Sequence, residues 1–107
     1  EACMHVGGDA SAQLAELASR AGVTPATQAD VKQEWLVAER ARELMWEGHR
    51  RTDLIRYGLF TSEDFLWVFK GGEPKGKALG DHMNLFAIPK TEREGNPDLK
   101  QNPGYVE

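Results

Sequence analysis

Hydrophobic positions in the first part of the chain recur at intervals of three and four residues, which is the period of an α-helix. This pattern predicts a short helix over residues 1–6, ended by the glycine pair that follows it. A second helix is predicted over residues 10–21, with Asp9 as its N-cap and Gly22 as its end. Both helices are short, and they follow each other at the spacing of tetratricopeptide-like stacking.

A longer helix is predicted over residues 28–47, with Thr27 and Asp30 in a capping arrangement at its start and Gly48 at its end. A helical projection gives it two apolar patches instead of one. Val31, Val37, Ala38, Ala41, Leu44 and Met45 form the first patch, and Trp35, Leu36 and Trp46 form the second. Because a helix covered on two sides belongs to a larger body, we expect the chain to be part of a longer protein.

The remaining elements are shorter and less regular. A helix is predicted over residues 49–57, ended by Gly58, and another over residues 63–70, capped by Thr61 or Ser62. Residues 84–107 contain three prolines and three asparagines, so they predict an irregular tail with one turn of helix at 91–94. The predicted fold is mainly α, with tetratricopeptide-like helices in 1–22, a helix pair in 28–58, and a short helix, loop and Pro/Asn-rich tail in 59–107.

Composition narrows the range of functions. Thirteen basic and 17 acidic residues give a net charge of −4, which offers no general attraction to nucleic acid. The single cysteine, Cys3, excludes an internal disulfide and a multi-cysteine metal site. No apolar run is long enough to span a bilayer, and we expect neither a cofactor nor a resident metal.

Charged residues are concentrated between apolar ones in residues 39–56. Carboxylates beside tryptophans are partly desolvated, so each is expected to pair with a nearby guanidinium group three or four residues away. This reasoning predicts a structural ion-pair network that fixes the geometry of two helix segments. Its members are Glu39, Arg40, Arg42, Glu43, Glu47, Arg50, Asp53 and Arg56.

Other interpretations of the polar and aromatic residues compete with this one. Glu43, Glu47 and Asp53 could act as paired catalytic carboxylates, but adjacent arginines would keep them ionised and leave no proton donor. His49, Asp53 and His82 could bind a metal, without a clear further ligand.

Trp67 is a candidate for contact with a sugar, because aromatic faces stack on the apolar C–H groups of sugars. The alternative is that Trp67 is half-buried packing while its apolar neighbours, Phe65, Leu66, Val68 and Phe69, form core. Lys70, Lys75 and Lys77 are most simply a solvated loop.

Two long motifs resemble the C-terminal signature of the SusD/RagB family. The first is ERARELMWEGHRRTDLIRYG, over residues 39–58, and the second is NLFAIPKTEREGNPDLKQNPGY, over residues 84–105. They occur in the order that the family has, and they depart from its pattern only slightly: Ala87 replaces a proline and Thr52 an aromatic residue. The resemblance covers essentially the whole chain, but only the C-terminal portion of a family member.

This resemblance implies a function that is not enzymatic. Family members are surface lipoproteins of Bacteroidetes that bind glycans or other nutrients and lie on a TonB-dependent transporter of the SusC type in the outer membrane. The implied lipid anchor belongs to an N-terminal segment that these 107 residues do not include, and Cys3 is not its site. The resemblance assigns no ligand-binding role to any residue here, so the segment is expected to be mainly scaffold. Two rival hypotheses are a free-standing helical module that binds other proteins and a hydrolase acting on glycans.

Overall fold

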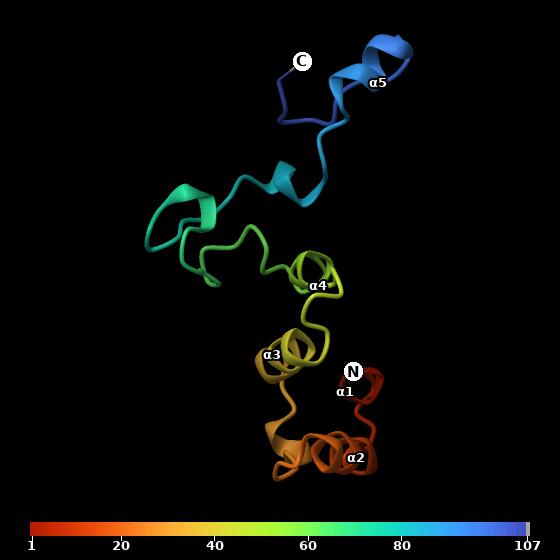
Figure 1. The fold of residues 1–107 in the computed structure, drawn as a ribbon, viewed down its shortest axis with the longest axis vertical. Helices are drawn as coiled ribbons and strands as arrows, with labels where there is room; N and C mark the ends of the chain where they lie inside the picture. The colour runs from red at the N-terminus through yellow and green to blue at the C-terminus, as the bar shows by residue number, and fades with distance from the viewer. Residues whose placement is uncertain (107) are drawn as a thin grey trace. The chain divides into compact units, whose positions relative to one another are not determined.

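A computed structural model describes residues 1–106, and this range is helical, with no strand. The mainly α fold class predicted from the sequence is confirmed. The α-helices are α1 (Ala2–Val6), α2 (Ser11–Ala21), α3 (Gln33–Glu43), α4 (Arg50–Arg56) and α5 (Lys90–Gly95), with 3-10 turns at Gln28–Asp30, Lys70–Gly72 and Asp81–Asn84 (Figure 1). The chain forms two compact units, one from Glu1 to Asp53 and one from Leu54 onward.

The first two helices end where the sequence predicts. Gly7 and Gly22 adopt the left-handed conformation, with φ of 68° and 67°, and their N–H groups bond the carbonyls of the preceding turn. Helix α2 begins one position later than expected, with Ala10 as its N-cap residue. Asp9 still contributes there, because its carboxylate accepts the Ser11 backbone N–H at 2.9 Å.

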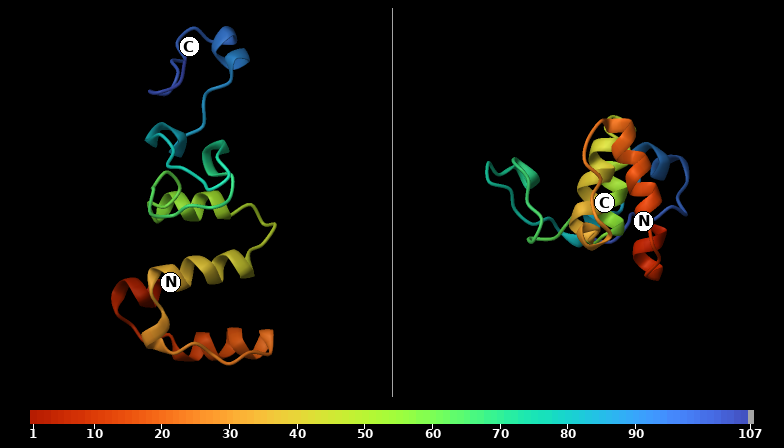
Figure 2. Two further views of the ribbon diagram at one scale, coloured as in Figure 1. Left: turned by 90° about the vertical axis from the view of Figure 1, so that its left-hand side faces the viewer. Right: turned by 90° about the horizontal axis from the view of Figure 1, so that it is seen from below.

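Helices α2 and α3 run in the same direction, because the connection between them returns along α2 (Figure 2). The Gln28 side chain fixes this return: its Oε1 accepts the Ala10 N–H at 2.9 Å and its Nε2 donates to the Gly8 carbonyl at 3.2 Å. At the other end, Arg20 of α2 forms an ion pair with Glu43 of α3. An antiparallel helix hairpin would not bring these ends together, so α2 and α3 do not form one. The tetratricopeptide-like helices predicted in residues 1–22 stay a prediction.

The single helix predicted over residues 28–47 is wrong. Thr27 and Asp30 do form a capping box, but it closes a 3-10 turn, and Lys32 then adopts an extended conformation before α3 begins. At the other end, α3 stops at Glu43, and Trp46 has a left-handed backbone with φ of 70°. Apolar residues keep their helical spacing beyond Glu43. That spacing gives no sign of a left-handed backbone conformation at a residue other than glycine.

The helix predicted over residues 63–70 does not form either. These residues make bends, and Phe69 has φ of 64°. Leu66, Val68 and Phe69 are exposed, so their predicted place in the core is also wrong. The core is formed instead by Leu14, Ala18, Leu36 and Val37 in the first unit and by Leu54 in the second.

Lys70 is buried at the end of the segment for which a helix was predicted. Its side chain is only 1% exposed, although the sequence predicts a solvated lysine. The Nζ donates to the carbonyls of Leu59 at 3.4 Å, Phe65 at 2.7 Å and Ser62. Only the Phe65 carbonyl belongs to residues 63–70, and it bonds this ammonium group instead of the N–H of a following helical turn. Burial lowers the pKa of Lys70 from its ordinary 10.5, while the hydrogen bonds to carbonyls favour the charged form.

Three side chains hold the C-terminal tail. The Gln101 amide pairs with both backbone groups of Ile88, accepting its N–H at 2.9 Å and donating to its carbonyl at 3.0 Å. Asn102 donates to the Phe86 carbonyl at 2.8 Å, and the Tyr105 hydroxyl donates to the Leu85 carbonyl at 2.7 Å. Side chains of the QNPGY segment therefore hydrogen-bond to the backbone of the NLFAI segment. They satisfy backbone groups that a neighbouring strand would satisfy in a sheet.

The turn at Asn102–Tyr105 requires glycine. Gly104 has φ of 90°, and the Tyr105 N–H bonds the Asn102 carbonyl at 3.3 Å, as in a type II turn with proline in the second position. A Cβ on Gly104 would lie 2.6 Å from the Cβ of His82, whose ring meets the Tyr105 ring edge-on at 4.8 Å.

We therefore expect Gly104→Ala to lower the free energy of unfolding by about 1–3 kcal/mol from backbone strain alone, with the clash adding to it. Gly95→Ala is the matched control, because its Cβ would meet nothing within 4 Å and its φ is not positive. The control should leave stability unchanged or raise it slightly. Urea denaturation of both variants measures this difference, and equal midpoints would contradict the account of the turn.

Candidate functional site

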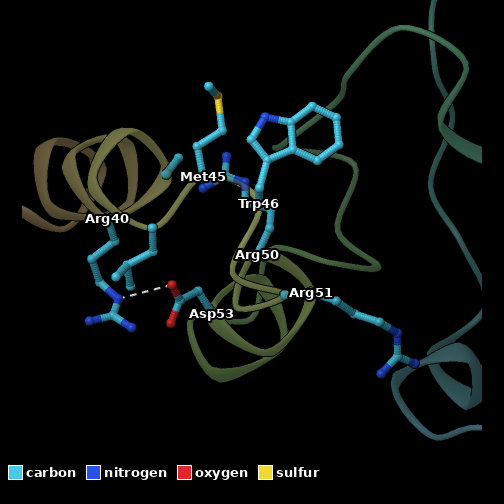
Figure 3. Close-up of a pocket in the computed structure, with 9 residues that line it drawn as sticks. Arg40, Met45, Trp46, Arg50, Arg51 and Asp53 are labelled. Carbon is cyan, nitrogen blue, oxygen red and sulfur yellow. Dashed lines mark hydrogen bonds and ion pairs between the residues drawn. The ribbon is translucent and has the colours of Figure 1, made fainter.

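The candidate site is a pocket formed by the end of α3, the turn after it and the start of α4 (Figure 3). Its volume is about 590 Å³, within the usual range for small-molecule sites. Its lining combines charged side chains with the apolar side chains of Met45 and Trp46. The full lining consists of Arg40, Ala41, Leu44, Met45, Trp46, Gly48, Arg50, Arg51 and Asp53.

An ion pair between Arg40 and Asp53 links the two helices that form the pocket. Arg40 Nε donates to Asp53 Oδ2 at 2.9 Å (Figure 3). Asp53 is only 4% exposed. Arg40 also lies 3.5 Å from the Glu1 carboxylate through Nη1. Arg50 reinforces the link in the opposite direction, because its Nη1 donates to the Val37 carbonyl of α3 at 2.9 Å.

The other charged residues of the predicted network have a mixture of local and distant partners. Glu39 accepts from Arg42 Nε at 3.0 Å, one of the local pairs expected from the sequence. Glu43 pairs with Arg20 of α2, a partner that sequence spacing could not indicate. Glu47 is exposed and makes no ion pair within residues 1–106. Whether these pairs act together as one network remains a prediction.

In the second unit, the Arg56 guanidinium lies over the Tyr57 ring at 4.9 Å from its centroid. This contact is a cation–π interaction, which arginine forms readily because its planar guanidinium group stacks on an aromatic face.

Trp46 was not singled out by the sequence as a site residue, and the structure makes it conspicuous. It is 94% exposed, and its neighbour Met45 is 67% exposed. Both side chains project away from the Arg40–Asp53 pair (Figure 3). An unusual backbone angle at an exposed aromatic residue leaves no trace in hydrophobic periodicity, so no sequence signal could have found it.

Trp67, the sequence-predicted candidate for sugar contact, lies in the second unit. Its ring stacks against Phe60 at 6.1 Å and lies tilted to Phe65 at 6.3 Å. Lys70 Nζ lies 4.8 Å from the Trp67 ring centroid. These contacts leave 37% of the residue exposed, so Trp67 mostly serves the packing around the buried lysine.

The structure brings no metal-binding cluster together among the described residues 1–106. His82, one of the candidate ligands, packs against Tyr105 and beside Gly104 in the second unit. His49 belongs to the turn before α4, where its carbonyl accepts the Asp53 N–H at 2.9 Å. In the same part of the chain, no helix is both long and apolar enough to cross a membrane.

Comparison with known proteins identifies the family. The sequence profile of the SusD family matches residues 1–105. The chain belongs to the SusD family. It is 41% identical over 105 residues to the starch-binding protein SusD of Bacteroides thetaiotaomicron, in an alignment that covers 98% of this chain and 19% of that protein. The chain therefore spans about a fifth of the length of this curated relative, and the resemblance inferred from the two motifs is confirmed.

Both motifs of this SusD-family chain now have a structural interpretation. The first contains the C-terminal end of α3, all of α4 and the turn between them, and hence the whole pocket with its Arg40–Asp53 pair. The second contains the amide and hydroxyl groups of Gln101, Asn102 and Tyr105 together with the backbone that they bond. In each motif, ion pairs or hydrogen bonds of polar side chains thus join separate segments of the chain.

The Arg40–Asp53 pair generates a prediction about stability. Asp53→Asn preserves the shape of the side chain but removes the charge opposite a partly buried guanidinium, so it should lower the free energy of unfolding by about 1–3 kcal/mol. Glu47→Gln, which makes the same chemical change at an exposed position, should stay within about 0.5 kcal/mol of the original protein. Urea denaturation measures both, and the account fails if the two variants are equally stable.

Proposed function

We propose that this chain is part of a cell-surface lipoprotein of the outer membrane that binds a glycan and delivers it to a TonB-dependent transporter of the SusC type. Within that protein, residues 1–106 serve mainly as scaffold. The protein binds its ligand and does not cleave it.

The observation that carries this proposal is the match to the SusD family over residues 1–105. The relative from Bacteroides thetaiotaomicron is named as starch-binding, and 41% identity over 105 residues supports a related ligand class here. Surface location, lipid anchoring and the transporter partner follow from the family resemblance and are part of the proposal.

The geometry of the charged residues supports the scaffold role. Arg40 and Arg50 each form a hydrogen bond that joins α3 to α4. Gln101 and Asn102 bond backbone groups of the same unit. Replacing a residue that bonds a buried backbone group or a buried charge lowers the stability of the fold. These residues therefore have a structural role whether or not they contact a ligand.

The same pairs argue against glycoside hydrolysis. A glycosidase needs one carboxylic acid that keeps its proton and one carboxylate across an open cleft. Glu39, Glu43 and Asp53 each form an ion pair with a guanidinium group. These ion pairs give the three carboxylates a structural role that does not require catalysis.

Electrophoresis of the protein in native gels that contain a polysaccharide tests the proposal. Soluble starch, xylan and dextran serve as the panel, and we expect at least one of them to slow the protein relative to a gel without polysaccharide. The same mixtures, assayed for reducing ends, should show no release of sugar over the buffer control.

Two results would overturn the proposal. Unchanged mobility with every polysaccharide of the panel would remove glycan binding. A rise in reducing ends that is lost in a Glu43→Gln variant would make the protein a hydrolase.

A further inference from the structure

The ammonium group of Lys70 is surrounded by backbone carbonyls of its own loop. Its Nζ donates to the carbonyls of Leu59 at 3.4 Å, of Phe65 at 2.7 Å and of Ser62. An ammonium group has three N–H donors and no acceptor, so these three carbonyls match its bonding capacity. The centroid of the Trp67 ring lies 4.8 Å from the same nitrogen, and an aromatic face attracts a cation.

This arrangement differs from a buried ion pair. Among residues 1–106, Lys70 forms no ion pair with a carboxylate, so the carbonyl dipoles and one indole ring compensate its charge. A charge removed from water is costly unless polar groups around it replace the water. Backbone carbonyls replace the hydration shell of monovalent cations in ion-selective sites in the same way. The three carbonyls therefore have the chemistry of a cation-binding site.

The loop of residues 59–79 closes around this ammonium group. The Lys70 carbonyl accepts the Lys77 N–H at 3.0 Å, and the Thr61 carbonyl accepts the Leu79 N–H at 3.0 Å, so the two ends of the loop lie close together. None of the apolar side chains in this loop is fully buried, whereas Lys70 is 1% exposed. The ammonium group thus takes the central place that an apolar core takes in other small units.

We propose that the carbonyls of Leu59, Ser62 and Phe65 form a binding site for a primary ammonium group, which Lys70 occupies from within the chain. Occupation of this site holds the loop of residues 59–79 closed. The site takes a primary ammonium in preference to a potassium ion, because three carbonyls satisfy three N–H donors but leave a metal ion incompletely coordinated. This inference does not depend on glycan binding.

Chemical rescue of a Lys70→Ala variant tests the inference in the whole protein. The substitution deletes the side-chain atoms from Cγ to Nζ, and n-propylammonium supplies the same atoms in the same order. Hydrogen exchange at the amides of Lys77 and Leu79, measured by mass spectrometry, should become at least about tenfold faster in the variant as the loop opens. Addition of n-propylammonium chloride should slow this exchange toward that of the original protein.

Matched controls separate the ammonium group from volume and ionic strength. Propanol has the same size as n-propylammonium without its charge, and potassium chloride supplies a cation without N–H donors, so neither should slow the exchange. Lys70→Met fills the space with an apolar chain, so its exchange should be fast and should stay fast with n-propylammonium. Rescue of Lys70→Ala by propanol or potassium chloride to the same extent, or no rescue by n-propylammonium, would overturn the inference.

Amine labelling of the original protein tests the occupied site without any substitution, and it decides the matter if Lys70→Ala does not fold. Lys75 lies in the same loop and is exposed, so it is the internal reference. With acetic anhydride, Lys70 should be acetylated at least about tenfold more slowly than Lys75, because the reagent reaches a buried amine only when the loop opens. Equal rates at the two lysines would contradict the occupied site.

Discussion

The first unit depends on the Arg40–Asp53 ion pair, because it joins α3 to α4 across the turn that forms the pocket. The bond between Arg50 and the Val37 carbonyl runs in the other direction across the same turn. Two arginines therefore fix one turn from both sides. Burying Asp53 without Arg40 would leave a desolvated charge, so the buried carboxylate favours the arrangement in which Arg40 bonds it. The exposed Trp46 is presented by this fixed turn.

Long polar side chains do the work of regular secondary structure in the second unit as well. Lys70 donates hydrogen bonds to backbone carbonyls that lie outside any helix or sheet, and Gln101 pairs with both backbone groups of Ile88. An irregular chain leaves many such groups to be bonded, and an unbonded buried group is costly. A small domain rich in proline and asparagine can therefore keep a defined path, provided that specific side chains of the right length are in place.

The sequence predicted well where the deciding interaction is local. The glycine ends of α1 and α2 and the Thr27–Asp30 capping box lie within a few residues of their partners, so spacing reveals them. Prediction failed where a distant contact decides the structure. Lys70 bonds a carbonyl 11 positions away, and Glu43 pairs with a residue 23 positions away. The left-handed Trp46 was missed because residue type argues against it.

A double-mutant cycle between Arg40 and Asp53 tests the central claim most directly. The stabilities of Arg40→Ala, Asp53→Ala and the double variant are measured by urea denaturation. If the pair joins α3 to α4 as described, the double variant should lose less stability than the sum of the single variants, with a coupling of about 1–3 kcal/mol. Additive losses would show that the two residues act independently, and they would contradict the account of how the turn is held.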